Sequence, residues 1–337
     1  MKIKDKKKLA RVIATWVVTT IMVSVFVLDI ITLVLDNKYV SSVEITDENF
    51  DGTLGDDRIH FLNTANSDCI LLESNGHFAL VDSGEGDENP RKKTEYEGFG
   101  DEVLGYIKKV ASDKNGKVTL DFILATHMHY DHAGNFTRII ADNDIEIGCA
   151  YIKPYDTVNN SEMEKDGWGN EQTYKSIIDA LKKRNIKTIQ DIPDESFTFG
   201  DFTCKFFNGI TPEELRKNGE NANSIGMSLS KGNKTAFLAA DITAGTGLED
   251  YYAEDIGDVD LLKIGHHGYY GSSSADFLRI LKPEIAICTN YIGKIYPNVK
   301  WNLTMVAKTS VFSTAHRNGI IATFTDDGEI KLTQNIM

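Results

Sequence analysis

The sequence predicts an α/β protein in which helices cover β-sheets, preceded by one helix that crosses a membrane. From residue 58 onward, short apolar runs bounded by turn residues alternate with amphipathic stretches, which is typical of sheets covered by helices. A cluster of histidines directly follows one strand-like run, and a long apolar run stands near the N-terminus. The composition, 41% hydrophobic and 26% charged, is that of a globular protein and argues against disorder.

The N-terminal segment predicts a membrane anchor. Residues 12–35 are uncharged except for Asp29 near their end, and they are long enough to cross a hydrocarbon core of about 30 Å. Six basic residues and one acid precede the run, so the tail should stay in the cytoplasm and the body should lie outside the cell membrane. A cleaved signal peptide is the alternative, but the long run and the missing A-x-A site favour an uncleaved anchor. The expected parts are a tail (1–11), a transmembrane anchor (12–35), a linker (36–56) and a catalytic domain (57–337).

Charge and cysteine content narrow the ligand classes. The net charge is −14, and residues 1–11 contribute +5, which leaves −19 on the rest. Such an acidic body repels polyanions at long range, so nucleic acid is not the expected partner, whereas a small anionic ester remains compatible. The four cysteines are widely spaced and form no CxxC pair, so we expect buried apolar side chains, with one disulfide left open as an alternative.

The body should consist of the following elements. Strands are expected at 59–62, 69–73, 78–82, 120–125, 202–207, 225–229, 235–240, 259–264 and 285–288, with a hairpin turn at Asn75-Gly76. Helices are expected at 103–110, 173–183, 248–253 and 275–281. The polar stretch 156–170 is expected to be a surface loop near the site.

The residues that follow the strand at 120–125 carry the chemistry. His127 and His129 are two residues apart in an extended segment, so both side chains point to one side and can share a metal ion. After the chain turns, the adjacent Asp131 and His132 can address a second metal ion. Imidazole nitrogens and carboxylate oxygens are ligands that zinc accepts.

Two later strand ends supply further candidate ligands. The run 235–240 ends in Asp241, whose two oxygens can bridge two cations, and the run 259–264 is followed by His266 and His267. Asp82 ends another strand on the same expected rim. Both adjacent histidines could reach a metal, so the residues alone do not decide between them.

These motifs resemble the metallo-β-lactamase superfamily. They are T-H-M-H-Y-D-H at 126–132, V-D-S-G at 81–84, A-A-D at 239–241 and K-I-G-H-H-G at 263–268. The resemblance covers roughly residues 57–335 and implies an αβ/βα sandwich with metals at the strand ends. The stretch 58–85 and the spacing from Asp241 to His267 resemble the catalytic module of teichoic-acid phosphorylcholine esterases. The His-His-Gly segment is also similar to the related domain of bacterial DNA-uptake channel proteins.

The resemblance implies a ligand set for two zinc ions, with Mn²⁺ or Fe²⁺ as alternatives. His127 and His129 would hold one ion, Asp241 would bridge, and the second ion would be held by Asp131, His132 and His267. No histidine lies between His132 and His266, so the usual third histidine of the first ion is absent. That departure leaves the first site open and favours phosphoester over β-lactam hydrolysis.

The remaining site residues follow from this arrangement. Asp131 and His266 are expected to be catalytic, with His266 facing the substrate as a proton donor. We expect Asp82 and Thr126 to orient ligands, and the residues near the substrate to be Asn223, Trp168 and Tyr269.

The sequence thus predicts an extracellular, membrane-anchored phosphodiesterase. A hydroxide bridging two zinc ions would attack a phosphorylcholine-like or other phosphoester of the cell envelope, such as a choline-bearing polymer. The alternatives are a nuclease related to the DNA-uptake domain, which the charge of −19 disfavours, and a metal-binding ectodomain without catalysis.

Overall fold

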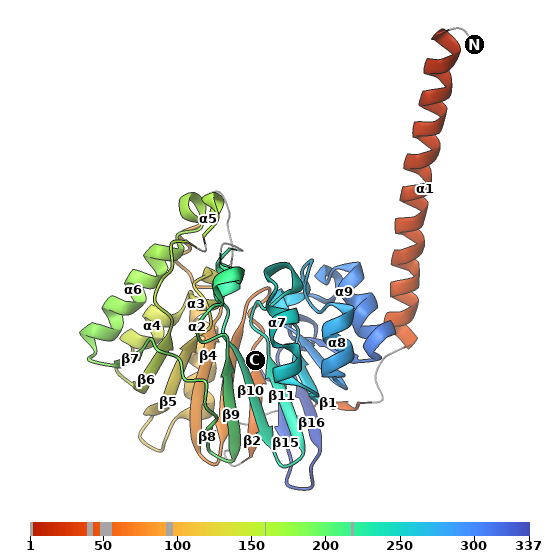
Figure 1. Ribbon diagram of the computed structural model, residues 1–337. Helices are drawn as coiled ribbons and strands as arrows, with labels where there is room; N and C mark the ends of the chain where they lie inside the picture. The colour runs from red at the N-terminus through yellow and green to blue at the C-terminus, as the bar shows by residue number, and fades with distance from the viewer. Residues whose placement is uncertain (1–2, 39–42, 48–55, 92–96, 159, 217–218) are drawn as a thin grey trace. The chain divides into compact units, whose positions relative to one another are not determined.

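The chain forms two compact units, Met1–Val40 and Ser41–Met337, in a computed structural model (Figure 1). The structure describes residues 3–38, 43–47, 56–91, 97–158, 160–216 and 219–337. The first unit is helix α1 (Ile3–Lys38), in which Lys6–Val27 is long and apolar enough to span a membrane and has no buried residues. A membrane anchor and a signal sequence both fit this helix. The side chain of Asp29 and most of the predicted linker, 39–42 and 48–55, lie outside the described residues.

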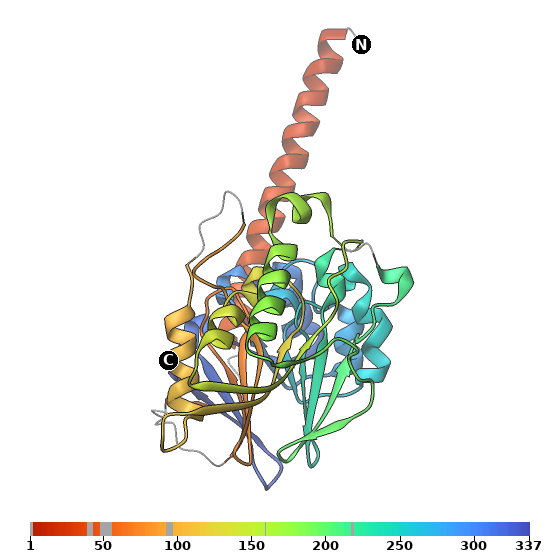
Figure 2. The ribbon, with the colours of Figure 1, turned by 90° about the vertical axis from the view of Figure 1, so that its left-hand side faces the viewer.

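The second unit is built on two β-sheets. Among the described residues, the first sheet has nine strands, in the order β1 (Ile45–Thr46), β16 (Ile330–Gln334), β15 (Ile320–Phe324), β2 (Asp57–Phe61), β3 (Cys69–Ser74), β4 (His77–Ser83), β5 (Val118–Ala125), β6 (Ile145–Ile152) and β7 (Lys187–Ile189). The second has seven described strands, in the order β14 (Ser310–Ser313), β13 (Ile285–Cys288), β12 (Leu261–Lys263), β11 (Lys234–Leu238), β10 (Gly226–Lys231), β9 (Phe202–Phe207) and β8 (Phe197–Phe199). Figure 2 shows the two sheets as adjacent layers.

Helices and short 3₁₀ or π segments connect the strands. The α-helices are α2 (Gly100–Ala111), α3 (Tyr130–Ala133), α4 (Phe136–Ala141), α5 (Glu162–Gly167), α6 (Asn170–Lys183), α7 (Leu248–Ile256), α8 (Ala275–Leu281), α9 (Pro297–Trp301) and α10 (Thr314–Arg317). The shorter segments are η1 (Glu213–Leu215), η2 (Glu220–Asn223), η3 (Ala244–Thr246), η4 (Gly265–Gly268), η5 (Ile292–Lys294) and the π segment η6 (Asn302–Ala307).

Three apolar clusters define a sandwich of four layers. One cluster packs α2, α4 and α6 against the outer face of the first sheet. The second lies between the sheets, where alternate residues of β2 to β5 meet those of β9 to β13. The third packs α7, α8 and α9 against the outer face of the second sheet. All described members of the clusters follow residue 42, so the body has its own core and does not need α1 to bury apolar surface.

The predicted α/β sandwich is confirmed. The Asn75-Gly76 turn joins β3 to β4 as a hairpin, and both residues have positive φ, as a tight two-residue turn requires. Cys69, Cys149, Cys204 and Cys288 are free thiols, so the described residues contain no disulfide. One expectation is corrected: the stretch 156–170 is not a continuous loop, because a capping box between Ser161 and Glu164 begins helix α5 there.

Candidate metal centre

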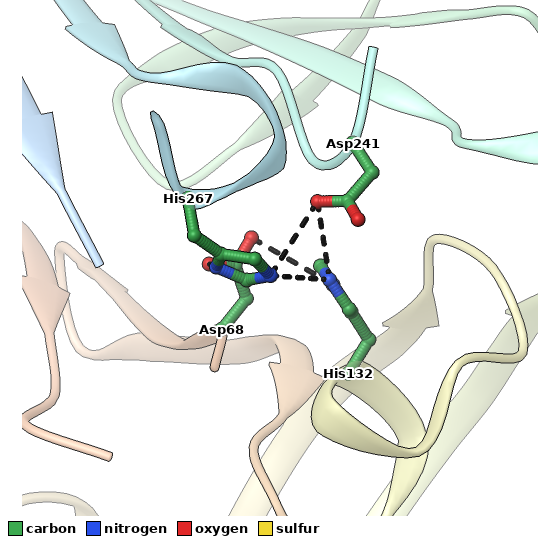
Figure 3. Close-up of side chains that lie close together, drawn as sticks. All are labelled: Asp68, His132, Asp241 and His267. Atoms are coloured by element: carbon green, nitrogen blue, oxygen red, sulfur yellow. Dashed lines mark hydrogen bonds and ion pairs between the residues drawn. The ribbon is translucent and has the colours of Figure 1, made fainter. Parts of the chain in front are cut away.

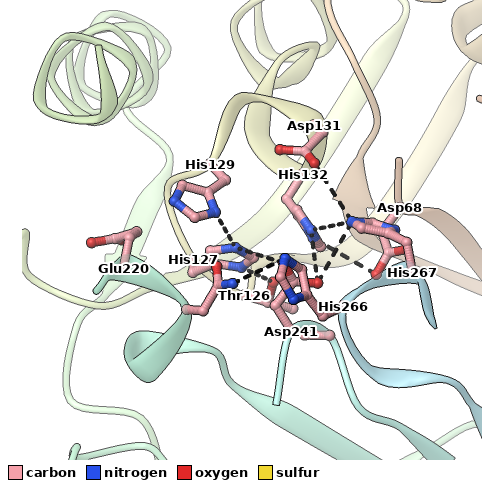
Figure 4. A network of polar contacts seen from close by, with 12 residues as sticks. Asp68, Thr126, His127, His129, Asp131, His132, Glu220, Asp241, His266 and His267 are labelled. Atoms are coloured by element: carbon pink, nitrogen blue, oxygen red, sulfur yellow. Dashed lines mark hydrogen bonds and ion pairs between the residues drawn. The ribbon is translucent and has the colours of Figure 1, made fainter. Parts of the chain in front are cut away.

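The ends of parallel strands bring the candidate ligands together. β4 and β5 run parallel in the first sheet, and β11 and β12 run parallel in the second. Because carboxyl ends of parallel strands meet at one edge, the segments after β5, β11 and β12 converge there. Figure 4 shows that the side chains of His127, His132, Asp241 and His267 point toward one another from these segments.

A first group of ligand atoms consists of His127, His129 and Asp241, all buried. His127 Nε2 lies 3.2 Å from His129 Nδ1 and 3.6 Å from Asp241 Oδ2. Their spacing of two residues places both rings beside Asp241, so His127 and His129 could share one metal ion. The opposite face of the His129 ring lies against Trp168, with ring centroids 4.8 Å apart.

A second group joins His132 and His267 to the other oxygen of Asp241 (Figure 3). The Nε2 atoms of the two histidines are 3.1 Å apart, and Asp241 Oδ1 lies 3.2 Å from that of His132 and 3.6 Å from that of His267. Asp131 Oδ2 lies 3.5 Å from His267 Nε2. Asp241 thus offers one oxygen to each group, which is the geometry of a carboxylate between two cations.

Each of these four histidines is held at its second ring nitrogen by an oxygen. The contacts are Thr126 Oγ1 to His127 Nδ1 (3.1 Å), Glu164 Oε1 to His129 Nε2 (3.0 Å), Asp82 Oδ2 to His132 Nδ1 (2.7 Å) and Thr289 Oγ1 to His267 Nδ1 (3.1 Å). Metal-bound imidazoles have this arrangement, since the outer hydrogen bond sets the tautomer and ring direction. Asp82 and Thr126 lie behind His132 and His127, and Thr126 also donates to Asp82 through its hydroxyl (2.7 Å).

Asp68 is a buried carboxylate that the sequence analysis missed. It lies close to the second group, with Oδ1 3.2 Å from His267 Nδ1 and Oδ2 3.7 Å from His132 Nδ1. These are the outer nitrogens, and Asp68 is also paired with the buried ammonium of Lys263 and accepts from Thr289. We therefore assign Asp68 to orienting the histidines rather than to holding a metal. Burial would raise its pKa, but Lys263, His267 and His132 together lower it below the usual value.

Glu164 and Glu220, also missed, support the first group. Glu164 accepts from the backbone N–H of Glu220 (2.9 Å), and Glu220 accepts from the backbone N–H of Met128 (3.0 Å), between the two histidines. Burial raises the pKa of Glu220 to about 7. For Glu164 burial acts in the same direction, but hydrogen bonds from His129 and Ser161 outweigh it and lower the pKa to about 2. The two carboxylates thus differ in protonation near neutral pH.

The donor atoms fit a pair of metal ions. Asp131 Oδ1 and Asp241 Oδ1 are buried and have no hydrogen-bond partner within the part of the chain that the structure describes. Burial alone would raise the pKa of Asp241, yet the charges of His132, His266 and His267 together hold it well below its usual range. An ionised, buried carboxylate oxygen without a hydrogen bond is costly unless a cation is close. The buried histidine and aspartate groups are therefore consistent with a binuclear metal site.

His266 and His267 occupy different places. His267 is buried within the second group, whereas the side chain of His266 is 30% exposed, with Nε2 3.8 Å from Asp241 Oδ2 and 3.3 Å from Asn221 Nδ2. Both residues have positive φ, 47° and 50°, an uncommon conformation for L residues other than Asn, Asp and His. This tight turn is what sends two adjacent side chains in different directions, one into the centre and one to its edge.

The remaining predicted residues lie around this centre. Tyr269 is beside His266, with ring centroids 5.4 Å apart. Asn223 is farther out: its amide donates to Glu220 (3.1 Å), and its carbonyl accepts from Thr211. Arg91, which the sequence analysis did not single out, is paired with Glu85 and lies 3.7 Å from Asp131 Oδ1. The roles of all these residues in binding remain predictions.

Part of this chain is similar in sequence to known proteins. Residues 62–189 match the metallo-beta-lactamase superfamily. Recombination protein 2 of Haemophilus influenzae is 21% identical over 216 residues, which are 64% of this chain and 22% of that protein. The chain thus spans about a fifth of the length of this relative.

Solved structures with a similar course of the chain have low sequence identity. The metallo-beta-lactamase fold protein YhfI from Bacillus subtilis is 16% identical, with a TM-score of 0.47 over 77% of this chain and 96% of that one. Zn²⁺-bound PqqB from Methylobacterium extorquens is 11% identical, with a TM-score of 0.44 over 73% and 85%.

The chain has the metallo-β-lactamase fold, and residues 62–189 are similar to the metallo-beta-lactamase superfamily. Its buried histidines and aspartates are consistent with the metal site of a metal-dependent hydrolase whose substrate is not identified.

Proposed function

We propose that this protein is a membrane-anchored phosphodiesterase that uses two zinc ions and acts outside the cytoplasm. One observation carries the proposal: the two buried ligand groups share Asp241, and every ligand histidine is held from behind by an oxygen. A group that merely filled the core would not leave Asp241 Oδ1 buried and without a hydrogen-bond partner at the point where the rings converge.

The charge of the centre suits a phosphodiester. Two divalent cations bring +4, and the carboxylates of Asp131 and Asp241 bring −2, so the centre retains positive charge for a singly charged ester. The Arg91 guanidinium lies beside Asp131 and adds a cation at this edge. When bound, two zinc ions would polarise the phosphoryl oxygens and lower the pKa of a bound water to about 7.

The chain's own residues would orient the metal ligands and transfer a proton. Glu164 and Asp82 orient His129 and His132, so that the metal-facing nitrogens stay in place during turnover. His266 lies at the exposed edge, where its Nε2 can share a proton with the leaving oxygen of the ester. The Trp168 ring, tilted by 52° against that of His129, would limit the space beside the first ligand group.

The substrate class is supported by charge and by the openness of the first site. Its ligand group contains His127, His129 and Asp241, so a substrate oxygen could complete the coordination of that ion. A phosphorylcholine-like headgroup or another envelope phosphoester would suit a body that carries a helix able to cross a membrane. Mn²⁺ or Fe²⁺ are alternative ions, because both accept imidazole and carboxylate ligands.

A nuclease is the second candidate. The similarity to Recombination protein 2 favours it, although the matched segment is only 22% of that protein. The net charge of −19 outside residues 1–11 disfavours it, since phosphate backbones are bound by basic surfaces.

A substrate panel tests both candidates. Residues 41–337, with zinc or manganese restored and metal content measured, would be assayed on bis-p-nitrophenyl phosphate, p-nitrophenyl phosphorylcholine and single-stranded DNA. We expect hydrolysis of the small diesters and little cleavage of DNA. The variant His127→Gln removes a proposed metal ligand. His77→Gln is its matched control, because His77 is an exposed histidine paired with Asp121 away from the site. Stoichiometric metal without turnover on any ester would favour a metal-binding ectodomain.

A further inference from the structure

Exposed aromatic and basic side chains gather around α9. We propose that this surface rests on the headgroup region of an anionic lipid bilayer. We call it the aromatic–lysine surface, and its members are Tyr270, Tyr296, Trp301, Met305, Lys294 and Lys308.

Exposed apolar side chains are concentrated there. Outside α1, the described large hydrophobic residues that are exposed are Val158, Ile210, Tyr251, Tyr270, Tyr291, Tyr296, Trp301 and Met305. Five of these eight lie between residues 270 and 305, and Tyr270 is 73% exposed. Tyrosine and tryptophan prefer the boundary between lipid and water, because an apolar ring and a polar group can each meet its own environment.

The side chains form one face. Tyr270 and Tyr296 have ring centroids 6.0 Å apart, and Tyr296 precedes the first residue of α9. Trp301, which ends α9, and Met305 are four residues apart and therefore lie on the same side of the continuing helix. The opposite side, with Val299 and Leu303, is buried against the second sheet.

The charge of this region is opposite to that of the body. Residues 285–325 contain Lys294, Lys300, Lys308 and Arg317 and no acidic residue, whereas the chain outside residues 1–11 has a net charge of −19. Most of the body would be repelled by an anionic membrane, but this face would be attracted, because basic residues near the surface interact favourably with anionic lipids. The uneven charge thus favours the orientation of the body in which this face meets the membrane.

The surface adjoins the opening of the metal centre. The Tyr269 ring lies 5.4 Å from that of His266 and 6.1 Å from that of Tyr296. In Figure 1, α9 lies at the same end of the sandwich as α5, opposite the hairpin of β15 and β16. A body resting on this face would therefore present the centre to phosphoesters at the membrane surface. This last step rests on the proposed function, but the binding itself does not.

Vesicle binding tests the proposal without turnover. Residues 41–337, which have their own core, would be sedimented with vesicles of phosphatidylcholine alone or mixed with phosphatidylglycerol. We expect binding to the anionic vesicles that weakens with added salt. The double variants Lys294→Glu/Lys308→Glu and Trp301→Ser/Met305→Ser should each reduce partitioning by about tenfold or more.

Matched controls lie on other faces. Lys182→Glu/Lys183→Glu reverses two exposed charges on α6, and Tyr251→Ser removes an exposed ring on α7, so neither should change partitioning. Near-UV circular dichroism would verify folding of each variant. An equal loss of vesicle partitioning in control and test variants would overturn the proposal, and so would a lack of binding to anionic vesicles. The proposal would also be overturned if residues 41–337 formed dimers and the Trp301→Ser/Met305→Ser variant did not, because the surface would then join two copies of the chain.

Discussion

The two ligand groups of the metal centre have similar candidate ligands, but different kinds of residue hold these ligands from behind. Behind His132 and His267, the supporting groups are Asp82, Asp68, Thr289 and Lys263, which all lie at or next to sheet strands. Behind His129, the support comes from Glu164 on α5, a helix of six residues, and from Glu220 on a 3₁₀ segment.

This difference has a physical consequence. Strand ends are fixed by the sheets on both sides, whereas a short helix outside the sheets can open locally at a lower free energy. The second group also has a buried countercharge, Lys263, and the first has none in an equivalent contact among the described residues. We therefore expect the metal at His132 and His267 to bind more tightly than the metal at His127 and His129.

Removing the shared ligand should have the largest effect. Asp241→Asn takes a charged oxygen from both groups, so both metals should be lost together and hydrolysis should fall by roughly a thousandfold, corresponding to several kcal/mol of lost stabilisation. Metal content by elemental analysis, beside diester hydrolysis, would measure this. Retention of one tightly bound metal would mean that the groups do not share Asp241.

Breaking the buried ion pair should destabilise the fold. Lys263→Met leaves Asp68 buried without its ammonium partner, and we expect a loss of about 3–5 kcal/mol in the free energy of unfolding. Urea unfolding of residues 41–337 would measure it. The double variant Lys263→Met/Asp68→Asn should recover much of the loss. An unchanged unfolding midpoint in the single variant would remove the asymmetry between the two groups.

Removing the carboxylate behind one histidine should affect one metal. Glu164→Gln weakens the orientation of His129, and we expect affinity for the looser metal to fall by about 10–100-fold while the tighter metal stays bound. Asp82→Asn, behind His132, should have the opposite selectivity. Stepwise calorimetric titration of the metal-free body would separate the two, and equal loss at both sites in either variant would contradict independent support.

The smallest expected effect is a pH dependence. Burial raises the pKa of Glu220 to about 7, above the unfolded value near 4.5, so the folded metal-free body binds more protons between these values. Glu220 should therefore lower the stability by on the order of 1–3 kcal/mol as pH rises from about 5 to 7. Glu220→Gln should remove this contribution and leave those of Glu85 and Glu249, whose pKa values burial also raises to about 7. Asp68→Asn should leave the slope in place. Denaturant unfolding at several pH values would show whether Glu220 is responsible.

Much of the centre could be predicted because its ligands follow strands. His127, His129 and His132 lie in one short run, and Asp241 and His267 follow two strands with recognisable apolar patterns. Glu164 was missed although Ser161, three residues earlier, carries a capping-box signal that predicts a helix start.

Asp68 was missed for a topological reason. It precedes its strand, whereas the ligands predicted from the sequence follow theirs. Because β3 and β4 are antiparallel, with Cys69 opposite Ser83, the start of β3 lies at the same edge as the end of β4. Lys263 carried a weaker signal, because it is one of two charged residues, with Asp260, in the otherwise apolar strand predicted at 259–264.

The sequence alone determined the α/β class, the N-terminal apolar helix and the metal-type ligand run, because periodicity and ligand spacing are local properties of the chain. Tertiary structure decided which of His266 and His267 enters the centre, since their positive φ values depend on the turn after β12. It also decided which oxygens hold the histidines from behind, because residues as distant as Asp68 and Lys263 meet only when the two sheets pack. Contacts between remote segments leave no fixed spacing in the sequence.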